Sequence, residues 1–304
     1  MSDVEADGAK ANGASAEGTK ADEANLQDWV GRTEEASDQA YPTPARALAA
    51  TLDQAGVDAG VGKPLPELWH WLYFLPIVPA GEIGPDGHPK RGGFLPPIAL
   101  ERRMWASGRY VFHDRVRVGD VLHKTSKITR IAEKQGNTGR MVFVTVKHTV
   151  RSGRGPAVEE EQDIVYLPMP AAFTPPPPTP APENPAWSEP VALDPVLLFR
   201  FSALTFNGHR IHYDLPYARE TEKYPGLVLH GPLQALLLLE AARRHAPDRM
   251  PARYTFRAVY PLFGHDRLTL MGVARPDGGH DLFTVNGDGH VGMQATVAWA
   301  ANER

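Results

Sequence analysis

Five side chains that can bind, orient or move protons are concentrated in the stretch TFNGHRIHYD, residues 205–214. They are Asn207, His209, Arg210, His212 and Asp214. A histidine has an ordinary pKa near 6.5, so either imidazole can take up and release a proton at neutral pH. Such a cluster is typical either of an acid–base site or of a solvated turn, and the surrounding elements must distinguish the two.

Other chemistries find less support in the sequence. The His-x-x-His spacing at positions 209 and 212 also occurs in metal sites, but no third ligand follows nearby, so we expect no metal. The chain has no cysteine, which excludes a thiolate nucleophile and a disulfide framework. Glycine-rich fingerprint loops for dinucleotides or ATP are absent, so we expect no redox or nucleotide cofactor.

Composition indicates a globular protein. The chain has 304 residues, 42% of them hydrophobic, and a formal net charge of −4. This mild acidity gives no support for nucleic-acid binding. No apolar run approaches the ~20 residues of a membrane span, and the N-terminus lacks the basic and apolar regions of a secretory signal. We expect a disordered tail at residues 1–25, a cytoplasmic location and no membrane partner.

The first half of the chain, residues 26–170, is predicted to begin with helix and to continue as strands. Residues 26–55 favour helix, with Thr43 as N-cap, Pro44 at the first helical position and Gly56 as the stop. Alternating apolar and polar residues, many of them β-branched, then predict an antiparallel series. Its strands are expected at residues 109–134, 139–152 and 157–168.

An aromatic and proline-rich segment precedes these strands. Aromatic residues dominate protein cores, so we expect its aromatic side chains in the core, and the lining of a groove is the alternative. They are Trp69, Trp71, Tyr73 and Phe74. The later stretch GPDGHPKRGG, residues 84–93, is either a mobile flap near a substrate or an ordinary surface loop.

A proline-rich run at residues 171–190 separates this half from the next. Such a run is stiff and extended and cannot enter a sheet interior, so we predict a linker. The second half, residues 191–304, is predicted to hold one buried helix at residues 232–245, which has leucines on nearly every side. An antiparallel meander follows, with hairpin turns at PDGG and NGDG.

Two stretches of the second half resemble a known family. They are FNGHRIHYDLPYA, residues 206–218, and GLVLHGPLQALLL, residues 226–238. Both resemble the MaoC-like type-2 enoyl-thioester hydratases, or hydroxyacyl-thioester dehydratases, whose motif is Gly-Asp-x-Asn-Pro-(Ile/Leu)-His. The resemblance implies an α+β double hotdog: two antiparallel sheets, each wrapping a helix, paired within one chain. Residues 26–170 would form the non-catalytic hotdog and residues 191–304 the catalytic one.

The resemblance also implies roles for single residues. His212 matches the family's catalytic histidine and is expected to be the acid–base. Asn207 stands where the family has its catalytic aspartate, and an amide cannot accept a proton, so Asn207 is expected to hold the water. His209 stands where the family has an asparagine and is the alternative helper.

Substrate-binding residues are implied in the same way. Gly231, at the start of the predicted helix, would present backbone N–H groups to the thioester oxygen. His230 beside it is either part of the site or a cap or packing residue. Arg210, which replaces the family's proline, is a candidate for binding a substrate carboxylate, with Arg102 and Arg103 as rivals.

Longer matching stretches extend the resemblance over about residues 40–300. They are LPELWHWLYFLP, GPDGHPKRGGFLPPIALERRMWASG and YPGLVLHGPLQ. They resemble the branch that hydrates mesaconyl-C4-CoA, so the expected reaction is reversible hydration of an α,β-unsaturated acyl-CoA thioester, here mesaconyl-C4-CoA to citramalyl-CoA. The alternatives are an itaconyl-CoA hydratase, a 3-hydroxyacyl-ACP dehydratase, and an inactive hotdog that binds acyl-thioesters. A monomer and a homodimer are both compatible with this reading.

Overall fold

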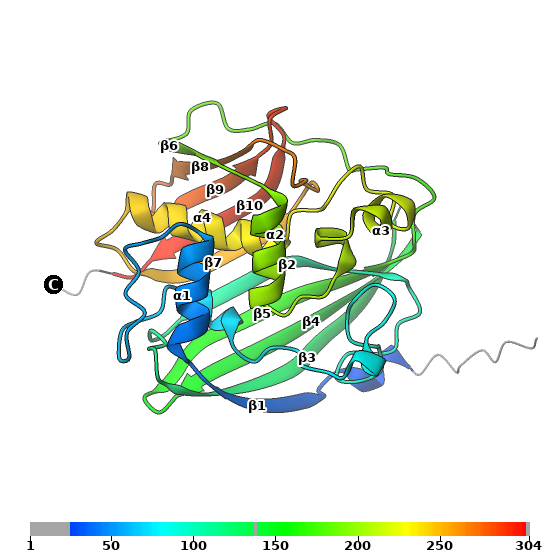
Figure 1. Cartoon of the computed structure of the whole chain (residues 1–304), viewed down its shortest axis with the longest axis horizontal. Coiled ribbons are helices and arrows are strands. Elements are labelled where there is room, and N and C mark those ends of the chain that lie inside the picture. Colours follow the sequence, from blue (N-terminus) through cyan, green and yellow to red (C-terminus); the bar gives the residue numbers. More distant parts are fainter. Residues whose placement is uncertain (1–24, 137–138, 302–304) are drawn as a thin grey trace, which may run out of the picture.

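The computed structural model describes residues 25–136 and 139–301. The tail predicted at residues 1–25 therefore lies, apart from Asn25, outside the described residues. All strand pairs in the described part are antiparallel, and the strands form one continuous sheet in the order β1-β3-β4-β5-β2-β7-β10-β9-β8-β6 (Figure 1). No helix among these residues is long and apolar enough to cross a membrane.

The elements follow one another in two groups. The strands before the proline-rich run are β1 (Thr33–Gln39), β2 (Arg102–Phe112), β3 (Val121–Gly136), β4 (Gly139–Ser152) and β5 (Gly155–Leu167). Those after it are β6 (Trp187–Val191), β7 (Pro251–Ala258), β8 (Leu268–Ala274), β9 (His280–Val285) and β10 (Val291–Trp299). The α-helices are α1 (Pro42–Thr51), α2 (Pro195–Leu204), α3 (Leu215–Glu220) and α4 (Gly231–His245). The 3-10 helices are η1 (Leu26–Trp29), η2 (Trp69–Leu72), η3 (Ala80–Glu82) and η4 (Arg210–His212).

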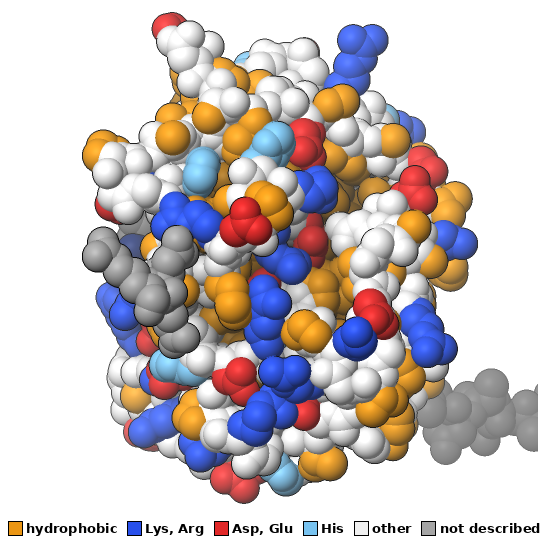
Figure 2. Space-filling view, turned by 90° about the vertical axis from the view of Figure 1, so that its left-hand side faces the viewer, with side chains coloured by type: hydrophobic (Ala, Val, Ile, Leu, Met, Phe, Trp, Pro, Cys, Tyr) orange, Lys and Arg blue, Asp and Glu red, His pale blue; other side chains and the backbone are white. Residues whose placement is uncertain are grey.

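The two groups of strands join where β2 pairs with β7. Residues 107–111 of β2 lie opposite residues 253–257 of β7, so the hydrogen-bond ladder continues from one half into the other. Figure 2 shows one side of the molecule, where basic and acidic side chains are interspersed around a central hollow. Several basic side chains follow one another down the middle of this face, with acidic ones beside them (Figure 2).

The long helix α4 confirms the predicted buried helix. Residues 233–242 are all buried, and the helix packs against strands of the second half (Figure 1). The first half has no helix of that length among the described residues, since α1 spans ten residues and packs against α2 and η2. Trp69 of η2 instead enters the core and donates from Nε1 to Glu240 of α4 at 2.9 Å. This bond ties the first half to the central helix.

The predicted core role of the aromatic segment is confirmed. Trp69 and Tyr73 are buried in the same cluster as the leucines of α4, and Trp71 and Phe74 pack against that cluster while partly buried. The segment therefore packs in the core beside the leucines of α4.

The helix predicted at residues 26–55 is wrong in its first part. Residues 33–39 form β1, which pairs along its whole length with residues 121–127 of β3. Glu, Ala and Gln favour helix weakly, and pairing at a sheet edge overrides that preference. Helix α1 then begins at Pro42 rather than Pro44, with Tyr41 as N-cap, and ends at Thr51.

The proline-rich run stays outside the sheet interior, as predicted, but its last residues are not linker, because they add a strand to the edge of the sheet. Strand β6 begins at Trp187 and pairs with β8 at the sheet edge. Earlier in the run, the backbone N–H of Ala181 donates to the carbonyl of Gly289 at 2.9 Å. Phe173 packs beside Tyr224 in a small apolar cluster. The division of the chain into two units at this run stays a prediction.

Candidate active site

The stretch of polar residues that follows α2 is a series of tight turns fixed by its own side chains. Asn207 Oδ1 accepts the backbone N–H of His209 at 3.0 Å. The backbone then turns through η4, and Asp214 caps α3 by accepting the N–H of Tyr217 at 3.1 Å. Because short polar side chains stabilise such turns, the loop has a defined shape without belonging to a helix or strand.

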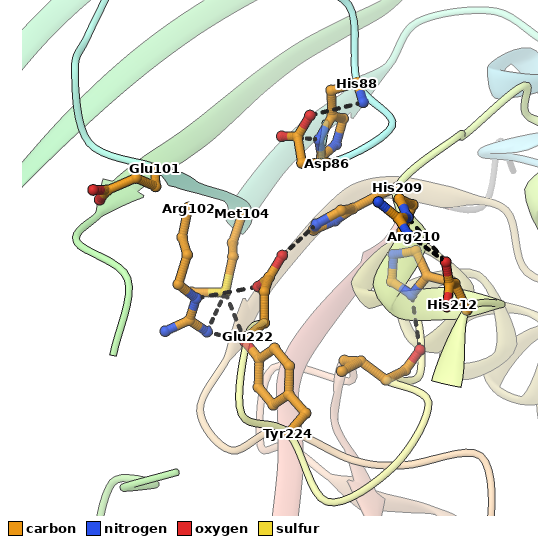
Figure 3. Close-up of polar contacts among 12 residues, drawn as sticks. Asp86, His88, Glu101, Arg102, Met104, His209, Arg210, His212, Glu222 and Tyr224 are labelled. Carbon is orange, nitrogen blue, oxygen red and sulfur yellow. Dashed lines mark hydrogen bonds and ion pairs between the residues drawn. The ribbon is translucent and has the colours of Figure 1, made fainter. Parts of the chain in front are cut away.

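His212 points inward, and one of its two ring nitrogens is hydrogen-bonded to the described residues while the other is not. It is buried, and its Nδ1 donates to the carbonyl oxygen of Val228 at 2.8 Å (Figure 3). A carbonyl only accepts, so in the neutral ring Nδ1 carries the proton and Nε2 the lone pair. Nε2 makes no hydrogen bond to the described residues. Burial, with the neighbouring imidazoles of His230 and His209, holds the pKa of His212 well below its ordinary value. The ring is therefore a neutral base at physiological pH.

His230 lies directly against His212. The two rings stack with centroids 3.6 Å apart, and His230 is the N-cap residue of α4. Its Nε2 is 2.8 Å from Ser202 Oγ, and its buried Nδ1 has no partner among the described residues. Burial, aided by His209, lowers the pKa of His230 to about 3. The stack fixes His212 at the N-terminal end of α4, where Gly231 begins the helix.

Folding stability is expected to fall as the pH drops below about 6.5. In the unfolded chain His230 binds a proton near pH 6.5, but in the folded chain only near pH 3, so acid favours unfolding between these values. The loss is up to about 1.4 kcal/mol per pH unit for each such histidine. We expect urea unfolding between pH 7.5 and 5.5 to show a shallower pH dependence for His230→Gln, but not for the exposed His265→Gln. Equal slopes in all three proteins would contradict this account.

His209 is engaged in a different network. Its Nε2 lies 3.0 Å from Oε1 of Glu222, and Oε2 of that carboxylate accepts from Arg102 Nε at 3.2 Å (Figure 3). The Arg102 guanidinium also donates to the hydroxyl of Tyr224. Glu222 is 2% exposed, so this is a buried ion-pair network in which His209 is already bonded. The sequence analysis missed Glu222, because nothing in its neighbourhood marks a glutamate after α3 as buried.

The segment GPDGHPKRGG, whose place the sequence left open, lies over the motif. Gly87 and Gly208 approach so closely that a Cβ on Gly87 would meet the carbonyl oxygen of Gly208 at 1.8 Å. His88 packs its ring 4.3 Å from that of His209, and Asp86 accepts from His88 Nδ1 at 3.0 Å (Figure 3). The first half of the chain therefore contributes side chains beside the histidines.

Arg210, a predicted carboxylate ligand, is already occupied by protein groups. Its Nε and Nη2 donate to Asp214 Oδ2 at 2.9 and 2.8 Å, and its Nη1 donates to the carbonyl of Pro85 at 3.0 Å. The guanidinium also lies 4.2 Å from the ring centroid of Tyr217. These contacts join the motif to the overlying loop and leave little of Arg210 for a ligand.

The N-terminal end of α4 suits a developing negative charge. Gly231 and Leu233 have backbone N–H groups in the first turn, while Pro232 has none. The nearest atom to a Cβ built on Gly231, the carbonyl oxygen of Trp105, is 3.7 Å away, so its main chain is not tightly covered. The site thus combines a base, Nε2 of His212, with donors for an oxyanion, the backbone N–H groups in the first turn of α4. No cluster of three or more His, Asp or Glu side chains in the described part is arranged to hold a metal.

Comparisons with known proteins show the family to which the chain belongs. A family model described as hydroxyacyl-thioester dehydratase type 2 matches residues 68–264. A Chloroflexus aurantiacus protein named mesaconyl-C(4)-CoA hydratase is 46% identical over 274 residues, covering 88% of this chain and 96% of that protein. The mitochondrial hydroxyacyl-thioester dehydratase type 2 of Schizosaccharomyces pombe is 26% identical, over 66% of this chain and 75% of its own.

Solved structures show the fold. HtdX of Mycobacterium tuberculosis aligns with a TM-score of 0.62 at 20% identity, covering 88% of this chain and 100% of its own. A MaoC-like dehydratase of Phytophthora capsici aligns with a TM-score of 0.67 at 13% identity, covering 91% and 98%. A double-hotdog protein of M. tuberculosis aligns with a TM-score of 0.53 at 13% identity, covering 89% of this chain and 96% of its own. The predicted α+β double-hotdog class is thereby confirmed.

Proposed function

We propose that this chain, which belongs to the hydroxyacyl-thioester dehydratase type 2 family, reversibly hydrates mesaconyl-C4-CoA to citramalyl-CoA. The chain is a hydro-lyase, and hydration of an α,β-unsaturated acyl-CoA is its reaction. The choice of acyl group rests on the 46% identity to the Chloroflexus aurantiacus enzyme. The observation that carries the chemistry is the neutral His212, whose Nε2 is unbonded among the described residues while its Nδ1 is fixed on Val228 at the start of α4.

In the hydration direction His212 acts first as a base. Its Nε2 takes a proton from water, and the hydroxyl adds to the β-carbon of the enoyl thioester. The electron pair of the C=C moves towards the thioester carbonyl, whose oxygen becomes enolate-like. Backbone N–H groups at Gly231 and the positive end of the α4 dipole stabilise that oxygen.

The same imidazole then acts as an acid. The proton held on His212 Nε2 passes to the α-carbon, the thioester carbonyl re-forms, and the histidine returns to its neutral state. Water and the enoyl thioester are the only reactants, so the reaction balances without a metal or redox cofactor. The reverse sequence dehydrates the hydroxyacyl thioester.

Asn207 and His209 have supporting roles in this proposal. Asn207 Oδ1 is held by the N–H of His209, which leaves the Nδ2 amide to donate to the attacking water. His209 is bonded to Glu222 and packs edge-on to His212, with ring centroids 5.5 Å apart. It therefore positions the acid–base histidine instead of exchanging protons itself.

The two halves of the chain divide the work. The second half supplies His212 and the first turn of α4. The first half supplies the segment of Asp86 and His88 and the strand β2, which lie against the motif. We propose that residues 26–170 form the non-catalytic unit and that residues 191–304 form the catalytic one.

A substrate panel tests the acyl group. We expect the purified protein to give its highest kcat/KM with mesaconyl-C4-CoA, followed by loss of the enoyl-thioester absorbance, against mesaconyl-C1-CoA, itaconyl-CoA and crotonyl-CoA. A higher kcat/KM with itaconyl-CoA, or with a long-chain 3-hydroxyacyl-ACP in the dehydration direction, would replace the proposed substrate by that one.

A further inference from the structure

We propose that Arg103, together with the hydroxyl of Tyr166, binds the second carboxylate of the substrate and so selects a dicarboxylic acyl thioester. The inference rests on the proposed function, since it concerns the same site. In mesaconyl-C4-CoA the free carboxylate is attached to the β-carbon, the atom that receives the hydroxyl. The group that binds this carboxylate must therefore lie close to His212 and the start of α4.

A carboxylate removed from water needs a cation or several hydrogen-bond donors. Three arginines near the motif are already engaged. Arg102 pairs with Glu222, and Arg210 pairs with Asp214 through two nitrogens. Arg91 donates to three backbone carbonyls of the segment that follows it. Arginines satisfied in this way would have to give up existing bonds before holding a substrate.

Arg103 differs from these three. It is partly buried and forms no ion pair within 4.0 Å with a described residue, and the side chain that bonds to it is the hydroxyl of Tyr166. It lies on β2 two positions before Trp105, whose carbonyl oxygen is 3.7 Å from a Cβ built on Gly231. Residues two apart on a strand point to the same face and lie about 7 Å apart. An extended arginine side chain spans this distance, so the guanidinium can reach the end of α4 where the thioester would lie.

Tyr166 supplies the second donor. It is the cross-strand partner of Arg103 on β5, and its buried hydroxyl lies beside the Arg103 guanidinium, while its own O–H has no acceptor among the described residues. A buried O–H without an acceptor is costly. A carboxylate that accepts from the Arg103 guanidinium can accept from this hydroxyl as well, which would satisfy both side chains at once.

One protein carboxylate competes for Arg103. Burial raises the pKa of Asp86, but bonding and charge interaction with His88, and the charge of Arg103, outweigh this and hold the pKa well below its usual value. Both Asp86 oxygens nevertheless bond to His88, to its backbone N–H and to Nδ1, each at 3.0 Å. Asp86 thus attracts the Arg103 guanidinium by its charge, but its oxygens are bonded to His88, and the N–H groups of Arg103 stay available to a substrate carboxylate.

The test compares two substrates that differ only in the second carboxylate. Mesaconyl-C4-CoA and 3-methylcrotonyl-CoA share one skeleton, with a methyl group in place of the carboxylate in the second. We expect Arg103→Gln to lower kcat/KM for mesaconyl-C4-CoA by on the order of 10- to 100-fold and to leave 3-methylcrotonyl-CoA unchanged. Tyr166→Phe should act in the same direction with a smaller factor. The exposed Arg253→Gln, on the neighbouring strand β7, is the matched control and should change neither.

Binding gives an independent readout. The saturated analogues of the two substrates, the corresponding methylsuccinyl thioester and isovaleryl-CoA, do not react, so their inhibition constants report affinity alone. Arg103→Gln should weaken only the methylsuccinyl analogue, and Arg103→Lys, which keeps the charge but not the two-pronged geometry, should weaken it less. Arg103→Lys also serves if Arg103→Gln does not fold.

Two results would overturn the inference. An equal loss on both substrates would assign Arg103 to the CoA moiety or to the fold, and no loss would remove it from the site. In either case a wild-type preference for mesaconyl-C4-CoA would leave the proposed function standing. A wild-type enzyme without that preference would instead refute the proposed substrate, and with it this role of Arg103.

Discussion

Replacing His212 by alanine is expected to lower kcat for mesaconyl-C4-CoA hydration by about 10³-fold, because positioned acid–base catalysis typically contributes 10²- to 10⁴-fold. No other described group takes over, since His209 is bonded to Glu222 and His230 has a pKa lowered to about 3. His212→Gln keeps most of the side-chain volume and should lose nearly as much activity. KM should change little, because the proton transfer takes place only in the transition state.

Two controls separate catalysis from folding in this experiment. The exposed His265→Ala should retain full activity, and circular dichroism should show His212→Gln to be folded. If folded His212→Gln hydrates the substrate at the wild-type rate, His212 is not the acid–base.

Replacing Glu222 by alanine is expected to destabilise the protein by roughly 3–5 kcal/mol, because breaking a buried ion pair leaves its partner uncompensated. Glu222 is 2% exposed and accepts from both Arg102 and His209, so its loss leaves a buried guanidinium and a buried imidazole without their acceptor. Activity at a permissive temperature should fall as well, since His209 packs against the acid–base histidine.

Chemical denaturation measures this loss. Glu220→Ala, two residues earlier and exposed, is the matched control and should fall within about 0.5 kcal/mol of wild type. Glu222→Gln keeps an acceptor for one partner and should lie between the two. A Glu222→Ala protein as stable as Glu220→Ala would show that the network does not stabilise the fold.

Local patterns predicted the framework of this protein well. The leucine-rich run at residues 232–245 indicated burial on all sides, and α4 is buried along residues 233–242. The antiparallel series of both halves was predicted as well, but the stretch predicted as strand at residues 109–134 holds the end of β2, a loop at residues 113–120 and most of β3, and β2 begins already at Arg102. These features depend on the period of apolar residues, which the sequence displays directly.

Elements that depend on distant partners were predicted less well. Residues 33–39 were expected to be helical, but they become β1 because residues 121–127 of β3 offer a free edge. The sequence of residues 33–39 does not itself indicate that a partner strand is available. The N-cap of α1 was misplaced by two residues because two prolines, Pro42 and Pro44, are both suited to the first helical turn.

The candidate site shows the same division. Its motif could be located from residue types alone, but its partners could not. Glu222 lies thirteen residues beyond His209, and the segment of Asp86 and His88 lies more than a hundred residues before it. Only the close approach of Gly87 and Gly208 has a trace in the sequence, as two glycines where a side chain would not fit.

The conversion of mesaconyl-C4-CoA to citramalyl-CoA, measured as kcat/KM against pH, tests the central claim most directly. Burial lowers the pKa of His212 well below 6.5, so the base remains neutral as the pH passes through that value. The rate should therefore stay level from pH 8 down past 6.5 and decline only in more acid solution where the protein is still folded. A decline centred at pH 6.5 or above, or the absence of citramalyl-CoA at any pH, would contradict the account.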